Sequence, residues 1–154
     1  MFASIVVGTD GSDRDLEVVR AAVRCATLSG GTVHIAHGFR PITSVAAGLA
    51  DGAPGAASVD FEALDEAVEA ENRHAIGAAT AVAAEAGVAT TEHSVAGDAA
   101  DVLLELADEV SADLIVIGNH GLHSRKRFLQ GSVANRVVHH APCCVLVVDV
   151  EPAR

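Results

Sequence analysis

Three glycines and a hydroxyl follow the most apolar run of the chain, in an arrangement suited to phosphate groups. The run Leu114-Ile115-Val116-Ile117 predicts a buried strand, and Gly118-Asn-His-Gly121 and then Gly131-Ser132 come after it. The stretch from Ser132 to Val138 predicts a helix that starts at the second half of this motif. A glycine loop and a helix N-terminus together offer bare backbone N–H groups and a positive dipole end, which favour an anion.

The insert between the two halves of the motif carries three consecutive cations. Arg125, Lys126 and Arg127 lie there in a chain with 10 basic and 21 acidic residues. Either at least one of these side chains contacts phosphate, or all three belong to an ordinary solvated loop. Glycine loops also occur because turns need them, but the full spacing G-x2-G-x9-G-S, ending at a helix start, favours a ligand site.

The charge and composition of the chain argue against several classes of partner. A formal net charge of −11 at pH 7 disfavours nucleic acid and anionic membranes, because the average field repels their phosphates. No apolar stretch approaches the roughly 20 residues that cross a bilayer. The cysteines, Cys25, Cys143 and Cys144, do not form a disulfide framework. We therefore expect a cytoplasmic protein with neither a nucleic-acid nor a membrane partner.

The elements that would position the motif alternate between strands and helices. Continuous apolar runs predict buried parallel strands at Ile5–Val7, Thr32–Ala36, Leu114–Ile117 and Val145–Val148, with a weaker pattern at Thr90–Val95. Helices are predicted at Asp13–Ser29 with Ser12 and Asp15 resembling a capping box, at Phe61–Ala86 before Gly87, at Ala99–Val110 after Asp98, and up to His140 before Pro142. This alternation predicts one α/β domain over residues 1–154, a doubly wound parallel sheet with helices on both faces.

In such a sheet, ligands bind beyond the carboxyl ends of the strands, where the strand order reverses. The first strand ends at Thr9-Asp10-Gly11-Ser12 and the fourth ends at Gly118. If these two strands are neighbours, both loops open into one crevice. Residues 40–60 are rich in Gly, Ala and Pro and form either a lid over this crevice or, as their few large apolar groups favour, a flexible disordered loop.

Several motifs together resemble the universal stress protein family. They are the glycine motif, the opening Val6-Val7-Gly8-Thr9-Asp10-Gly11-Ser12, the strand end Ala36-His37, and the closing Ala141-Pro142-Cys143-Cys144-Val145-Leu146-Val147-Val148. The resemblance covers nearly the whole chain apart from residues 40–60. It implies a five-stranded doubly wound sheet with strand order 3-2-1-4-5. The complete glycine spacing is the feature associated with the ATP-binding members of the family.

The resemblance also implies roles for individual positions. Gly118, Gly121, Gly131, Ser132 and Val133 would hold the ribose and phosphates through backbone N–H groups and the Ser132 hydroxyl. The adenine would be held by backbone groups at Gly8 and Gly38, and Thr9 and Ile117 also belong to the expected nucleotide site. Family members often carry a larger apolar residue at the position of Gly38, so this chain would grip the base more loosely or use Phe39 or Ile117 as a wall.

Asp10 would face the phosphates through a divalent metal. A carboxylate beside a triphosphate needs a cation between the two, and Mg²⁺ commonly joins one or two carboxylates to phosphate oxygens. For Asp10 alone, a role in the turn or in capping the following helix is the competing interpretation. The expected cofactors are therefore ATP and Mg²⁺, with Asp10 as the metal-facing residue.

A zinc site formed by His139, His140, Cys143 and Cys144 is an alternative that the predicted geometry disfavours. Cys143 and Cys144 enter a strand, where adjacent side chains point to opposite faces, so both do not readily ligate one ion. The two histidines suit the C-terminal end of a helix, where the dipole favours them.

Three functional hypotheses follow. No Walker A sequence and no obvious Ser-His-Asp arrangement or activated Cys accompanies the motif, so the first is an ATP-binding stress-response regulatory protein whose bound nucleotide shifts the interaction with an unidentified partner. The second is a slow ATPase or nucleotidyl-transferring enzyme. The third is a dimeric interaction protein with an empty site. The apolar last strand, Val145 to Val150, predicts an exposed sheet edge that pairs with a second copy in a homodimer.

Overall fold

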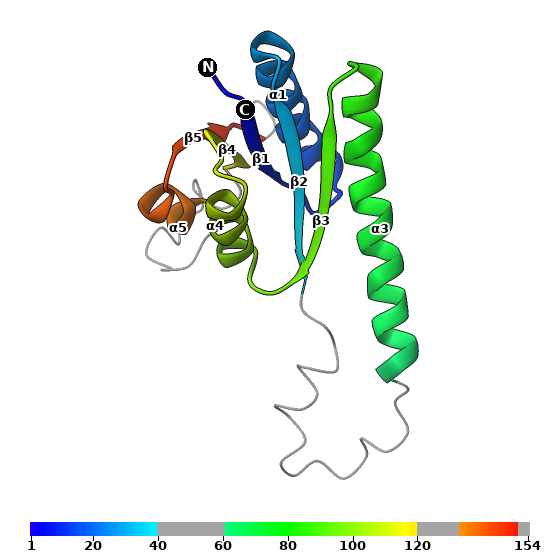
Figure 1. The fold of residues 1–154 in the computed structure, drawn as a ribbon. Helices are drawn as coiled ribbons and strands as arrows, with labels where there is room; N and C mark the ends of the chain where they lie inside the picture. Colours follow the sequence, from blue (N-terminus) through cyan, green and yellow to red (C-terminus); the bar gives the residue numbers. More distant parts are fainter. Residues whose placement is uncertain (40–60, 120–132, 151–154) are drawn as a thin grey trace.

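The apolar runs and the amphipathic segments form a parallel sheet with helices on both faces. The computed structural model describes residues 1–39, 61–119 and 133–150. Its strands are β1 (Ser4–Gly8), β2 (Thr32–Phe39), β3 (Thr90–Ala96), β4 (Leu114–Gly118) and β5 (Cys144–Val148). Its helices are α1 (Asp13–Ser29), α3 (Phe61–Glu85), α4 (Ala99–Glu109) and α5 (Val133–His140). The order β3-β2-β1-β4-β5, parallel throughout, confirms the predicted fold (Figure 1).

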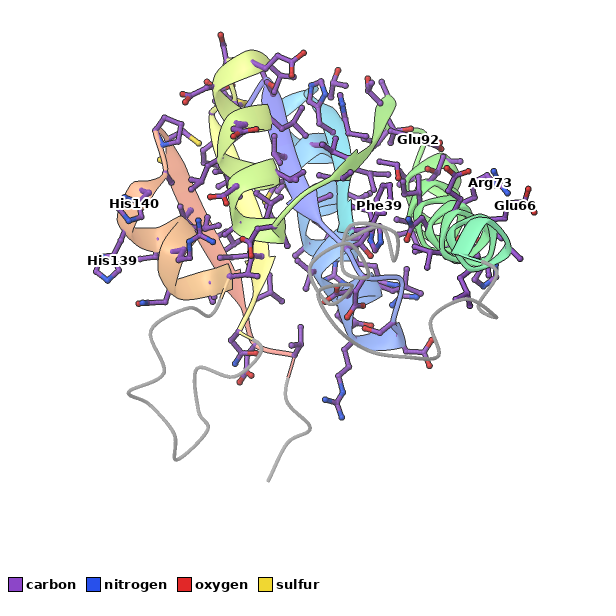
Figure 2. The ribbon with its side chains drawn as sticks, turned by 90° about the horizontal axis from the view of Figure 1, so that it is seen from below. Phe39, Glu66, Arg73, Glu92, His139 and His140 are labelled. Carbon is purple, nitrogen blue, oxygen red and sulfur yellow. The ribbon has the colours of Figure 1, made fainter. Side chains whose placement is uncertain are left out.

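Two layers of apolar side chains hold the helices against the sheet. Helices α1 and α3 cover one face, where their valines and alanines pack on residues such as Val7 and Ile35. Helices α4 and α5 cover the other face, where they pack on residues such as Val6 and Ile115. Figure 2, seen along the sheet from its carboxyl edge, shows the two helical layers on opposite sides. The alternation of Val6 and Val7 between the faces explains why both are fully buried.

The helix ends follow the sequence signals, with one difference. Ser12 caps α1 by accepting a hydrogen bond from the Asp15 N–H, and Gly30 ends it in the left-handed conformation, at φ 71°. Asp98 caps α4 by accepting from Ala100 N–H. The predicted capping box is wrong in its second half, because the Asp15 carboxylate accepts from the Asp10 N–H and not from Ser12. The chain turns sharply at Gly11, φ 79°, which brings the Asp10 N–H within reach.

The strand order reverses between β1 and β4, as the crevice hypothesis requires. Val7 pairs with Ile35 of β2 on one side and with Val116 of β4 on the other. Because β1 and β4 are parallel neighbours, their carboxyl ends lie side by side at the same edge of the sheet (Figure 1). None of the described helices combines the length and the apolar character that a membrane crossing needs.

Candidate functional site

A cavity of about 240 Å³ opens at the carboxyl ends of β1, β2 and β4. Its lining comes from the ends of these three strands, from the loop after β1 and from the N-terminal parts of α1, α4 and α5. The described lining residues are Gly8, Thr9, Asp10, Asp15, His37, Gly38, Ala99, Leu103, Ile117, Gly118 and Val133. Loops that lie far apart in the sequence thus meet at one place, where the fold class puts ligand sites.

The structure brings together most of the predicted site. Gly8, Thr9, Asp10, Gly38, Ile117, Gly118 and Val133 all line the cavity. The other predicted positions, Gly121, Gly131 and Ser132, lie outside the described residues, as do Arg125, Lys126 and Arg127 and the loop of residues 40–60. The predictions for these positions therefore stay predictions.

The glycines of β1 and β2 are places where a helix approaches the backbone. A Cβ on Gly8 would lie 3.2 Å from Leu103 Cδ1, and one on Gly38 would lie 2.9 Å from Ala99 Cα. The absence of a side chain at Gly38 therefore allows the first turn of α4 to pack against β2 and to line the cavity. Of the two side chains expected to compensate for Gly38, Ile117 lines the cavity, while Phe39 is not among the described lining residues. On the side of α4, the larger of the two apolar side chains that line the cavity is Leu103.

His37 is a site residue that the sequence analysis quoted but did not assign. Its Nδ1 lies 2.7 Å from the Thr9 carbonyl oxygen. Because a carbonyl oxygen only accepts, Nδ1 is the donor in this hydrogen bond. Thr9 is held further by its N–H, which donates to the Ala36 carbonyl at 3.0 Å, and by its hydroxyl oxygen, which accepts from Gly11 N–H at 3.0 Å. The loop that carries Asp10 is thus tied to β2 by two hydrogen bonds, both of which involve Thr9.

Two carboxylates give the cavity rim its charge. Asp10 is exposed and its Oδ1 accepts from the Ser12 N–H at 2.8 Å, so the predicted turn role is present. Asp15 is buried, and its Oδ2 accepts from the Asp10 N–H at 2.6 Å. No lysine or arginine is among the described lining residues. An anionic ligand here needs either a metal ion or cations from elsewhere in the chain.

Asn119, inside the glycine motif, is a second residue whose role was missed. It is 3% exposed, and its side-chain N–H donates to Asp149 Oδ1 at 2.6 Å while its Oδ1 accepts from Val150 N–H at 3.0 Å. Its own N–H donates to the Val148 carbonyl at 2.9 Å. The first turn of the motif is therefore fixed to the end of β5. A polar residue between glycines is the only signal for this in the sequence.

The histidines and cysteines near the C-terminus do not come together. Within the described ranges, no three His, Cys, Asp or Glu side chains are grouped as metal ligands would be. His139 and His140 lie on the last turn of α5 and project away from the sheet (Figure 2). Burial raises the pKa of the Cys143 thiol, and the adjacent Cys144 raises it further. That shift disfavours the thiolate, which is the reactive and metal-binding form.

Comparisons with known proteins agree on one family. A family model described as the universal stress protein family matches residues 1–149. A universal stress protein of Methanocaldococcus jannaschii is 33% identical over 148 residues, covering 96% of this chain and 82% of its own. Among solved structures, a universal stress protein in complex with cAMP is 33% identical, with a TM-score of 0.71 and 97% and 98% of the two chains covered. One from Archaeoglobus fulgidus in complex with dAMP is 30% identical, with a TM-score of 0.62 and 94% and 96% covered.

Proposed function

The chain belongs to the universal stress protein family, and from this membership and the cavity we propose that it binds an adenine nucleotide, ATP together with Mg²⁺. The observation that carries the proposal is the cavity at the switch point, where Gly8, Gly38 and Gly118 present backbone without side chains. Backbone groups in a mainly apolar cavity are suited to fixing a base and a ribose. Two similar proteins, solved with cAMP and with dAMP, lend support.

In this proposal the described cavity takes the nucleoside part of the ligand. Its volume of about 240 Å³ is below the roughly 300–1,000 Å³ typical of whole ligand sites. Ile117 and Leu103 would pack against the base. The phosphates would extend along the glycine motif, to the N–H groups of Gly121 and Gly131 and to the hydroxyl of Ser132.

Mg²⁺ fits the carboxylates at the rim of the cavity. Asp10 and Asp15 supply hard oxygen donors, which Mg²⁺ prefers. Asp10 is the exposed member of the pair and would face the β- and γ-phosphates through the ion. The cation would offset the repulsion between the carboxylates and a triphosphate.

Binding of cAMP is the second candidate, favoured by the relative solved with that ligand. A cyclic monophosphate carries a single negative charge and has no β- or γ-phosphate to share a metal with Asp10. Its affinity would therefore be independent of Mg²⁺. The dependence on Mg²⁺ separates the two candidates.

We further propose a regulatory role in the cytoplasm, carried out by a homodimer whose nucleotide state changes contact with another protein. β5 is an edge strand, and Leu146 and Val147 on it are each 37% exposed, which suits pairing with a second copy. Sedimentation at micromolar concentration should give a dimer, and a monomer would exclude this part of the proposal.

Freshly purified protein that is denatured and chromatographed tests the occupancy of the site. Stoichiometric adenine nucleotide in the supernatant is the expected result and would exclude the empty-site alternative. Conversion of added ATP to ADP over hours would favour slow hydrolysis over regulation. The variants Gly131→Val and Ser132→Ala should both weaken ATP binding while leaving the fold intact, and unchanged affinity in both would overturn the site assignment.

A further inference from the structure

Helix α5 has little apolar contact to fix its direction. It spans Val133–His140, and its buried residues are Ala134 and Val137. A helix of this length is not stable in water on its own, so its placement depends on tertiary contacts. Val133, its first described residue, lines the proposed nucleotide cavity. Whatever orients α5 therefore sets one wall of that cavity.

Arg136 joins α5 to the start of α4 through two carboxylates. Its Nη1 donates to Asp98 Oδ1 at 2.6 Å, and its Nη2 donates to Asp101 Oδ1. The same Asp98 oxygen accepts from Ala100 N–H at 3.0 Å and caps α4. A guanidinium is planar and presents its N–H groups in a fixed fork, so it constrains direction as well as distance.

Arg136, Asp98 and Asp101 are not among the described lining residues of the cavity, although Asp98 directly precedes the lining residue Ala99. The Arg136 side chain is 36% exposed and that of Asp98 is 34% exposed. Such half-buried pairs are less screened than fully exposed ones.

The ion pairs connect the two helical walls of the cavity. Ala99, the residue after Asp98, and Leu103 line the cavity from α4. Val133 lines it from α5, about one helical turn before Arg136. Movement of Arg136 away from Asp98 would thus shift Val133 relative to Ala99.

We propose that Arg136 is a positioning residue of the nucleotide site, which holds the N-terminal end of α5 at the distance from α4 that the ligand requires. This inference rests on the proposed function, because it names what orients that same site. Arg136 acts through the placement of α5 and contacts no ligand itself.

The test compares variants that break the ion pairs with a matched control. Arg136→Met keeps an unbranched side chain without charge, and Arg136→Lys keeps the charge without the fork. Asp98→Asn keeps a good helix cap but loses the charge. The control is Arg20→Met, which breaks the exposed pair of Arg20 with Glu17 on α1 at 2.7 Å. Binding of MgATP by calorimetry and unfolding by urea are measured on each.

Arg136→Met should raise the Kd for ATP about 5- to 10-fold, as expected for loss of a charge-assisted pair. The Kd values of Arg136→Lys and Asp98→Asn should lie between those of Arg136→Met and the wild type. Arg20→Met should change Kd by less than about 2-fold, since exposed pairs contribute little. A role in stability alone would lower the urea midpoint of Arg136→Met and leave its Kd unchanged.

A wild-type Kd in both Arg136→Met and Asp98→Asn would overturn the positioning role and leave the proposed function intact. If the wild type bound no nucleotide, the proposed function would fail instead. Amide hydrogen exchange of the ligand-free protein would then decide the positioning role. Exchange in α5 should be faster in Arg136→Met than in Arg20→Met, and equal rates would overturn the inference.

Discussion

Gly38 and Ala99 approach so closely that no side chain fits between them. A Cβ on Gly38 would lie 2.9 Å from Ala99 Cα, a distance that real Cβ atoms essentially never show. Gly38 is the last residue of β2 that lines the cavity, and Ala99 is the first residue of α4. The glycine at position 38 therefore has a packing role, because it lets α4 form the cavity wall.

Gly38→Ala is expected to lower the free energy of unfolding by about 1–3 kcal/mol, because the added methyl forces α4 away from β2. Urea unfolding measures the change. Gly77 in α3 is the matched control, since a Cβ there meets nothing within 4 Å. Gly77→Ala should raise the free energy of unfolding by about 0.5–1 kcal/mol through helix propensity. A Gly38→Ala variant as stable as the wild type would contradict the close approach.

Asp10→Asn separates the turn role of Asp10 from its proposed metal role. The Asn Oδ1 can still accept from the Ser12 N–H, which Asp10 does at 2.8 Å. The free energy of unfolding should therefore change by no more than about 0.5 kcal/mol, while the dependence of ATP affinity on Mg²⁺ should be lost. Asp13→Asn, on the exposed first turn of α1, is the control and should keep that dependence. Full Mg²⁺ dependence in Asp10→Asn would remove Asp10 from the metal site.

Asn119→Asp should destabilise the protein, because it places a carboxylate against Asp149, whose Oδ1 lies 2.6 Å from the Asn119 amide nitrogen. Loss of that buried donor is expected to cost about 2 kcal/mol in the free energy of unfolding. The double variant Asn119→Asp/Asp149→Asn restores a donor facing an acceptor and should recover most of this loss. Thermal or urea unfolding of the wild type and the two variants measures the loss and its recovery, and equal instability of the single and double variants would argue against the pairing.

Because His34 and His93 lie close together, we expect the free energy of unfolding to decrease on acidification. His34 Nδ1 lies 3.2 Å from His93 Nε2, and burial, followed by the charge of His93, lowers the pKa of His34 below 6.5. The unfolded chain then binds a proton at His34 more readily than the folded chain does. The free energy of unfolding therefore carries no penalty from His34 above pH 6.5, and it decreases as the pH falls from 6.5 towards the pKa of His34 in the folded protein.

Urea unfolding measured between pH 7.5 and pH 5 should show the free energy of unfolding decreasing with pH in the wild type, and decreasing less in His34→Gln. If the free energy of unfolding of His34→Gln depended on pH as it does in the wild type, the pH dependence would belong to other groups.

Much of the fold could be predicted because its signals are local. Continuous apolar runs predicted β1, β2, β4 and β5, whereas the mixed sequence of β3 gave only a weak signal. Helix α1 begins and ends at the predicted residues because Ser12 and Gly30 act as caps. The predicted ends of α3 and α4 each differ from the observed ones by one residue. Predicted neighbours such as Gly8, Asp10 and Gly118 do share one cavity, since parallel strand ends meet at one edge of the sheet.

The missed residues depend on packing between distant segments. Leu103 enters the cavity because α4 crosses the end of β2, and no local pattern specifies that contact. His37 bends towards the Thr9 carbonyl of a neighbouring loop, and Asp15 turns back to the Asp10 N–H. Such side-chain directions follow from sheet register and loop conformation, which the sequence alone does not fix.

Isothermal titration of nucleotide-free protein with MgATP tests the central claim most directly. The same titration is repeated with EDTA, with cAMP and with MgGTP as the control base. We predict saturable binding of MgATP at one site per chain, weakened by EDTA, with MgGTP bound much more weakly. Absence of binding by every adenine nucleotide at millimolar concentration would contradict the account.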